Sequence, residues 1–127
     1  MKSHTSLILG LIAGLAIGAI SVQGLHAKAK APAYLIVENN ISNPAAYKKE
    51  FVPVINRGIK EHGGQVIAAG KPTAFLGAAP KAHIVIQRWD SMDQLTNWLH
   101  SQQFKDALKI GRKYAKHLVF AIPGVTR

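Results

Sequence analysis

The stretch HIVIQRWDSMDQLTNWL, residues 83–99, contains the two kinds of element from which the fold can be predicted. Its first part, HIVIQRW, is rich in β-branched and aromatic residues and predicts a strand over residues 83–89. Ser91 with Gln94 three positions later is the pairing that caps the start of a helix. Apolar residues then recur every three or four positions, at Met92, Leu95, Trp98 and Leu99. A strand therefore leads directly into an amphipathic helix.

The same alternation precedes this stretch. AYLIVEN (33–39) reads as a strand, and QVIAAG (65–70) as a second, short one. Between them, Asn43 is a helix cap and Pro44 suits the first helical position, where its missing N–H is not needed. Two consecutive glycines, Gly63 and Gly64, end this helix, because one of them can take the left-handed conformation. Pro53 lies inside it and is expected to kink or divide it near Lys49 and Glu50.

After the opening stretch, the chain continues into a helical segment, SQQFKDALKIGRKYAK (101–116), and a last strand, HLVFAI (117–122). The element order is therefore β-α-β-β-α-β. This order predicts an α+β, ferredoxin-like fold, with one antiparallel sheet and both helices on the same face.

The strands are apolar on both faces. Consecutive apolar residues occur at Leu35 to Val37, Ile84 to Ile86 and Leu118 to Ile122. In a sheet with one face exposed to solvent, apolar and polar residues should instead alternate along each strand. Two helices can cover only one face. The pattern predicts a homodimer in which a second copy of the chain covers the other face.

The start of the chain has the layout of a secretory signal peptide. Lys2 and His4 precede an uncharged apolar run at residues 7–22, and small residues follow. We expect cleavage near Ala27 or Ala29, so that residues 1–27 are removed, 28–32 form a flexible leader and 33–125 form a single domain. The alternative is a retained membrane anchor, for which this run is short. The expected location is periplasmic or secreted, with no stable membrane insertion after cleavage.

The chain lacks cysteine and is strongly basic, with 16 Lys and Arg against 6 Asp and Glu and a net charge of +10. The lack of cysteine excludes disulfides and a lipid-modified cysteine anchor. For an exported protein, nucleic acid is not an expected partner. The charge either favours anionic surfaces and ligands or makes a soluble, self-repelling surface. In residues 101–116 the lysines share a solvent-facing side of the helix.

Arg112 differs from these lysines, because it lies one turn beyond Leu108, between the apolar and the basic side. Its guanidinium is expected either to orient a ligand carboxylate or to pair with Glu38 or an aspartate as a structural bridge.

Three segments together resemble the domain-of-unknown-function 1330 family, in the dimeric α/β-barrel (ferredoxin-like) superfamily. They are NPAAYKKE (43–50), HGGQVIAAG (62–70) and IQRWDSMDQLTNWLHSQQFKDALKIGRKYA (86–115). The resemblance covers residues 33–125 and implies a bacterial protein whose two chains close face to face into a barrel. It also implies superfamily relatives among cofactor-independent monooxygenases, isomerases and haem-degrading enzymes, although the family itself has no agreed activity. Arg112 matches the basic position typical of its segment, whereas Ala69 stands where an arginine is expected.

The sequence contains no recognisable catalytic set. Its histidines lack the spacing of a zinc motif, so no metal site is predicted, although one built from distant residues stays open. It contains neither a nucleophile elbow nor a glycine-rich phosphate loop, and no cofactor is predicted. Whether the protein is an enzyme is therefore left open.

Polar residues in otherwise apolar strands are the better indication of a site. His83 and Gln87 share one face of their strand, since they lie an even number of positions apart. The candidate pocket-lining residues are Glu38, His83, Gln87, Arg88 and Arg112. If the face of His83 and Gln87 lines the barrel, it supplies a polar lip to an apolar cavity, and the domain is expected to bind a small hydrophobic or anionic molecule there. The alternative function is a cofactor-independent oxygenase or isomerase, and the alternative for the residues is that they sit at strand ends or pair with each other.

Overall fold

The computed structural model describes residues 30–126, and residues 31–125 form one compact unit. The predicted signal peptide, residues 1–27, and the first two residues of the leader lie outside the described residues. Within the described part, none of the helices has the length and apolar character needed to cross a membrane.

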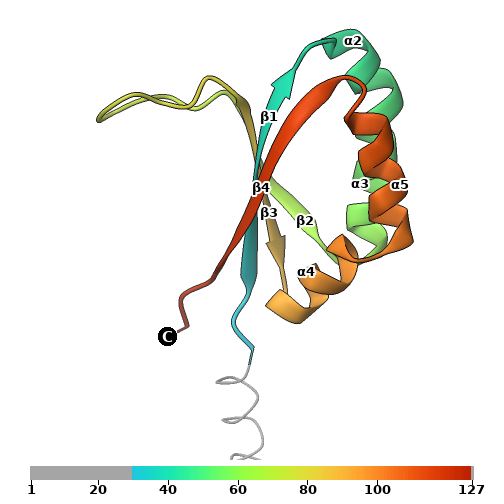
Figure 1. Ribbon diagram of the computed structural model, residues 1–127. Helices are drawn as coiled ribbons and strands as arrows, with labels where there is room; N and C mark the ends of the chain where they lie inside the picture. Colours follow the sequence, from blue (N-terminus) through green and yellow to red (C-terminus); the bar gives the residue numbers. More distant parts are fainter. Residues whose placement is uncertain (1–29, 127) are drawn as a thin grey trace, which may run out of the picture. The chain divides into compact units, whose positions relative to one another are not determined.

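The predicted order of elements is confirmed. The sheet has the strand order β2-β3-β1-β4, and every neighbouring pair is antiparallel (Figure 1). The elements are β1 (Ala33–Ile41), α2 (Pro44–Ala46), a π-helical turn η1 (Tyr47–Phe51), α3 (Val52–Glu61), β2 (Gln65–Gly70), β3 (His83–Trp89), α4 (Met92–Leu99), α5 (Gln102–Gly111) and β4 (Ala115–Pro123). This is the four-stranded ferredoxin-like α+β fold.

The first helical region begins and divides where the sequence predicts. The side chain of Asn43 accepts a hydrogen bond of 3.2 Å from the backbone N–H of Ala46, and Pro44 follows in the first turn. Pro53 has no N–H to donate to the carbonyl of Lys49, and the π-helical turn η1 spans that carbonyl. At the end of α3, Gly63 takes a positive φ of 87°, as expected for one of the two glycines.

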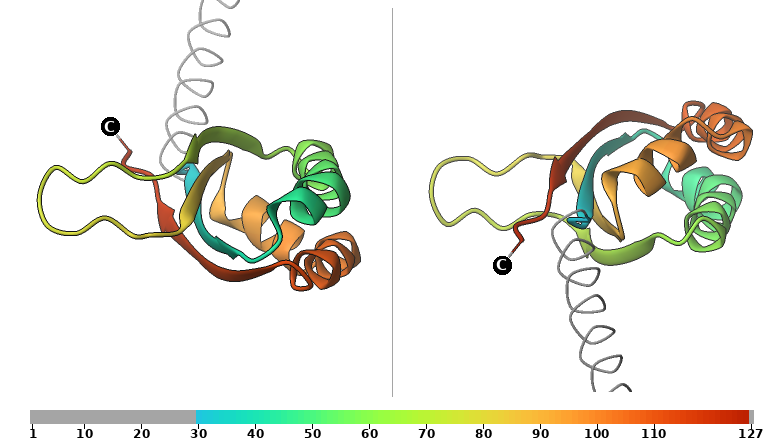
Figure 2. Two further views of the ribbon diagram at one scale, coloured as in Figure 1. Left: turned by 90° about the horizontal axis from the view of Figure 1, so that it is seen from above. Right: turned by 90° about the horizontal axis from the view of Figure 1, so that it is seen from below.

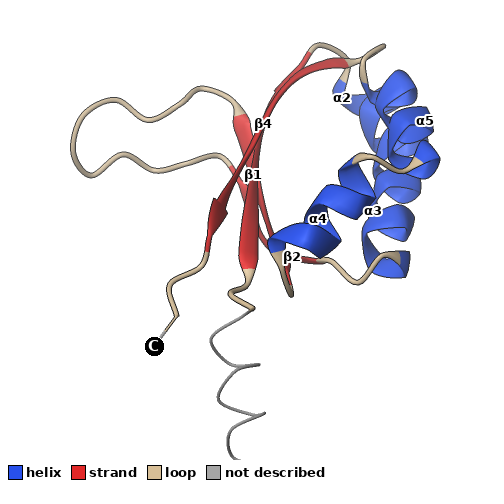
Figure 3. Cartoon of the chain, turned by 60° about the horizontal axis from the view of Figure 1, so that its bottom comes forward, coloured by secondary structure: helices blue, strands red, loops and turns tan. Residues whose placement is uncertain are grey.

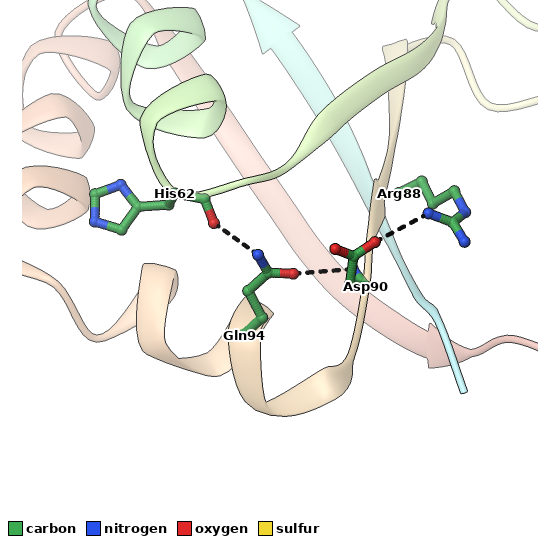
Figure 4. Close-up of polar contacts among 4 residues, drawn as sticks. All are labelled: His62, Arg88, Asp90 and Gln94. Atoms are coloured by element: carbon green, nitrogen blue, oxygen red, sulfur yellow. Dashed lines mark hydrogen bonds and ion pairs between the residues drawn. The ribbon is translucent and has the colours of Figure 1, made fainter. Parts of the chain in front are cut away.

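The second helical region consists of two helices joined at His100 and Ser101. Ser91 accepts a hydrogen bond of 3.1 Å from the N–H of Gln94 at the start of α4. The amide of Gln94 in turn accepts from the N–H of Asp90 and donates to the carbonyl of His62, each at 3.0 Å (Figure 4). The beginning of α4 is thereby fixed to the end of α3.

The helices all lie on one side of the sheet (Figure 3). Register places Leu35 beside Gln87 and Ala121 on the side that faces the helices. The core forms between these two layers, and its buried residues are Ala33, Leu35, Ile59, Trp89, Leu95 and Trp98. The alternate residues point away from the helices, and we call that side the open face.

The open face is apolar, as the strand pattern predicts. Ile36 lies between Ile86 and Phe120 on it. Along β4, Leu118 is 56%, Phe120 45% and Ile122 53% exposed. An uncovered apolar surface of this kind is uncommon on a monomeric protein. The second copy that the sequence predicts is not part of this structure, and the homodimer stays a prediction.

Candidate functional site

A cavity of about 720 Å³ lies between the sheet and the helices of the single chain. Its walls are mainly apolar and come from every layer of the fold. The sheet contributes Leu35, Val37, Val85 and Val119. The first helical region contributes Phe51, Val52, Ile55 and Ile59, and the second contributes Trp98, Phe104 and Leu108. A cavity of this size and composition is typical of a site for a small molecule.

A row of three polar side chains crosses the sheet at one end of this cavity. Asn39 of β1 pairs in register with His83 of β3 and with His117 of β4, so the three side chains lie side by side. All three line the cavity, and Asn39 is buried. We call His83, Asn39 and His117 the polar row.

Within the polar row, the Nδ1 atom of His117 lies 2.6 Å from the side-chain oxygen of Asn39. Two other ring nitrogens are buried and have no hydrogen-bond partner among the described residues: Nδ1 of His83 and Nε2 of His117. Most buried polar groups in proteins have a partner, since leaving one without is costly in free energy. Both nitrogens are covered by the chain itself, and Nε2 of His117 lies beside Gly111, where a Cβ would be 2.9 Å from it. A molecule in the cavity would therefore meet the polar row through those of its atoms that line the cavity.

Burial lowers the pKa of His117 below its ordinary value, and the nearby positive charge of Arg112 lowers it further. The carbonyl of Gly111 opposes this shift without reversing it. The imidazole of His117 is therefore neutral at pH 7, and one of its nitrogens can accept a proton or a hydrogen bond. Close by, burial raises the pKa of Tyr47 to about 12, so its phenol stays protonated.

Aromatic rings surround this end of the cavity. The ring of Phe51 lies 4.9 Å from that of Tyr47 and 5.6 Å from that of His117, centroid to centroid. Gly111 packs against the same group, because a Cβ there would lie 2.7 Å from Phe51 and 2.9 Å from His117. The close approach of α5 to β4 thus depends on glycine and fixes the position of the His117 ring.

The structure separates the five residues that the sequence proposes as a pocket lining. His83 and Gln87 share a face and both line the cavity. That face is turned toward the helices, so the cavity lies within one chain and not in a barrel between two sheets. Gln87 also has a structural role, because its side-chain oxygen accepts a hydrogen bond of 3.0 Å from the indole of buried Trp89.

The other three proposed residues lie outside this cavity. Glu38 and Arg88 belong to the open face, since they alternate with Val37 and Gln87 along their strands. Arg88 is exposed and forms an ion pair of 3.3 Å with Asp90 (Figure 4). Arg112 is exposed beside a smaller hollow, and the expected bridge to Glu38 is not among the ion pairs of the described residues.

Two members of the polar row were not singled out from the sequence. Asn39 alternates with Leu35 and Val37, so a polar residue at an inward position was the available signal. His117 opens the predicted last strand, and nothing local distinguishes it from a surface histidine. Their proximity depends on the pairing of β4 with β1, which joins residues far apart in the sequence.

In the described part of the chain, His, Cys, Asp and Glu side chains do not gather in groups of three or more that could hold a metal ion.

The fold is similar to that of several solved structures. A protein of unknown function from Rhodopseudomonas palustris is 14% identical, with a TM-score of 0.55 over 84% of this chain and 94% of its own. A putative antibiotic biosynthesis monooxygenase from Caulobacter crescentus is 13% identical, with a TM-score of 0.56 over 76% of this chain and 92% of its own. A cofactor-independent oxygenase from Streptomyces nogalater is 10% identical, with a TM-score of 0.52 over 76% of this chain and 96% of its own. At these identities the likeness shows the fold alone.

These structures share with this chain the ferredoxin-like α+β fold. The chain belongs to the DUF1330 family, a domain of unknown function, whose family model matches residues 32–125. The family resemblance predicted from the sequence is confirmed. No curated protein matches the chain.

Proposed function

We propose that the protein binds a small, mainly apolar molecule in the cavity between its sheet and its helices. The observation that carries this proposal is a cavity of about 720 Å³ with mainly apolar walls and, at one end, the polar row of His83, Asn39 and His117 among its lining residues. An apolar body would contact Val37, Val85 and Trp98, and a polar group at one end would meet the polar row. In small-molecule sites of proteins, apolar walls usually bury most of the ligand and a few polar groups fix its orientation.

The charge around the cavity bears on the kind of ligand. His117 is neutral at pH 7, and among the described residues that line the cavity Lys60 is the one Lys or Arg. A deeply buried anion would lack a compensating charge at the polar row. Of the hydrophobic and anionic ligands that the sequence leaves open, the interior therefore favours the hydrophobic one, with an uncharged polar group.

Calorimetric titration with 1-naphthol, a small arene with one hydroxyl, tests this proposal. A cavity-filling pair of substitutions, Val37→Phe with Val85→Phe, should weaken binding by about tenfold or more, because it occupies the space of the arene. The matched control is Phe120→Ser on the open face, which should leave the affinity unchanged. If Phe120→Ser abolishes binding and the filled cavity does not, the ligand sits on the open face and the proposal is wrong.

A cofactor-independent oxygenase is the second candidate function. It is favoured by the neutral imidazole of His117, which can accept the hydroxyl proton of an arene held against apolar walls. Two proteins with similar folds carry oxygenase or monooxygenase names. The test is oxygen uptake with 1-naphthol, in which one O₂ would give 1,4-naphthoquinone and water. Uptake that is lost in His117→Gln supports an enzyme, and binding without uptake supports the first proposal alone.

Two further proposals concern assembly and location. The apolar open face supports a homodimer in which two sheets meet. The layout of residues 1–27 supports export through a cleavable signal peptide. Sequencing the N-terminus of the protein from its producing cell tests the export proposal, and an intact Met1 in the cytoplasm would contradict it.

A further inference from the structure

The loop between β2 and β3, residues 71–82, projects away from the sheet on the side opposite the helices (Figures 1 and 2). Near its middle lie two consecutive large apolar residues, Phe75 at 96% and Leu76 at 98% exposed. Gly77 follows with a positive φ of 73° and allows the chain to turn back. We call residues 71–82 the arm and Phe75 with Leu76 its tip.

The tip has almost no contact with its own chain, whereas its residue types are those that gain most from burial. A single exposed apolar residue is common, but two adjacent ones on a projecting loop indicate a contact surface. The arm projects from the same side of the sheet as the exposed row Leu118, Phe120 and Ile122. One partner seated on the open face would therefore cover both.

The arm is long enough to reach across a second sheet packed on the open face. Each half of the arm has about six residues and reaches at most roughly 20 Å when extended. Two sheets that meet face to face lie about 10 Å apart. An arm with this maximal reach is long enough to extend past a facing sheet to the side of a partner chain.

The open face is also self-complementary in charge. It carries one acidic residue, Glu38, and two basic residues, Arg88 and Lys116, and Asn40 lies beside Lys116; the rest of β1, β3 and β4 on this face is mainly apolar. No ion pair of Glu38 is present among the described residues. In a twofold dimer, the same face meets itself, so an acid on one copy can approach a base on the other. The charges thus favour a second copy of this chain as the occupant.

We propose that the arm clasps a second copy of the chain, with Phe75 and Leu76 packed against the partner. This inference rests on the proposed homodimer and adds to it the segment that holds the two copies together. An anionic membrane is the competing partner, because Lys71 and Lys81 flank the arm. The second copy is favoured since the arm and the uncovered sheet lie on the same side and a single protein partner covers both.

Sedimentation equilibrium of the protein purified from cells that produce it tests the clasp. The variant Phe75→Ser with Leu76→Ser removes the tip, and Ala74→Ser with Ala78→Ser is the matched control in the same arm. The clasp predicts that the tip variant raises the dimer Kd by about tenfold or more, because truncating central apolar contacts weakens an interface strongly. The control should keep the Kd of the unaltered protein, and circular dichroism should show both variants folded.

Three outcomes would overturn the clasp. If the unaltered protein is a monomer at tens of micromolar, the homodimer and the clasp are both wrong. A dimer whose Kd is the same in the tip variant leaves the homodimer standing and refutes the clasp alone. The third outcome uses vesicles of phosphatidylglycerol and phosphatidylethanolamine: binding that is lost in the tip variant, with an unchanged dimer Kd, assigns the tip to a membrane.

Discussion

In the polar row, His83, Asn39 and His117 lie side by side on three neighbouring strands. Two positions along each strand, the next residues on the same face are Val85, Val37 and Val119. Alternation along one strand is a local property, and it was enough to predict that His83 and Gln87 share a face. The neighbours of Asn39 are set by pairing with distant strands, which no local pattern encodes. The site could therefore be predicted only in part from the sequence.

His117 should make the stability of the protein depend on pH. Its pKa is lower in the folded state than the ordinary value of 6.5, so the unfolded chain takes up the proton first. The free energy of unfolding should be unaffected by this group above pH 6.5 and should fall as the pH drops from 6.5 to the folded pKa. Urea unfolding at pH 7.5 and pH 5 measures the loss, which should be smaller in His117→Gln. An equal loss in both proteins would contradict the shift.

Gly58 lies where α3 contacts α4. A Cβ at this position would lie 2.3 Å from the ring of Trp98, which is fully buried. Alanine in place of glycine favours a helix by about 1 kcal/mol, whereas overpacking a core typically costs about 1–3 kcal/mol. Because the indole is held on several sides, overpacking should prevail.

We therefore predict that Gly58→Ala lowers the free energy of unfolding by about 1–2 kcal/mol in urea denaturation. Arg57→Ala, at the neighbouring exposed position of the same helix, is the control and should change it by less than about 0.5 kcal/mol. A more stable Gly58→Ala protein would show that the Trp98 ring moves aside.

The helix ends were the part of the fold most readily predicted, because capping depends on residues a few positions apart. Ser91 with Gln94, Asn43 with Pro44, and Gly63 all occupy the expected places. The hydrogen bond from Gln94 to the carbonyl of His62 was not predicted, since it joins two helices. The π-helical form of residues 47–51 was not predicted either, as Pro53 indicates a disruption but not its geometry.

Gln94→Ala should destabilise the protein by about 1–2 kcal/mol, because the part-buried carbonyl of His62 and the exposed N–H of Asp90 both lose their side-chain partner. Gln102→Ala is the matched control, since its bond to Asp106 is exposed and lies within one helix. The control should have an effect of at most about 0.5 kcal/mol. Equal melting temperatures of the two variants would mean that the hydrogen bonds of Gln94 between α3 and α4 add nothing to the stability of the protein.

The order of strands and helices determined the fold of the whole domain correctly, because β-α-β-β-α-β admits few arrangements. The side of the sheet that holds the cavity was not determined. Both faces of the strands are apolar in sequence, and only the packing of the helices distinguishes them. This is why Glu38 and Arg88, on the open face, were grouped with His83 and Gln87.

The open face should hold two copies together. Light scattering of the purified protein at micromolar concentration is expected to give twice the mass of one chain. Phe120→Lys places a charge in the middle of this surface and should produce a folded monomer, since desolvating an unpaired charge opposes association. Lys109→Ala on the exposed side of α5 should remain a dimer. A dimer that persists in Phe120→Lys would show that the two copies meet elsewhere.

If the cavity between the sheet and the helices holds the ligand, a crystal structure of the protein with 1-naphthol should show the arene between Val85 and Trp98. Its hydroxyl should lie within hydrogen-bond distance of His83 or His117. A cavity closed by its own side chains, with the arene bound only to the open face, would show that the ligand site lies elsewhere.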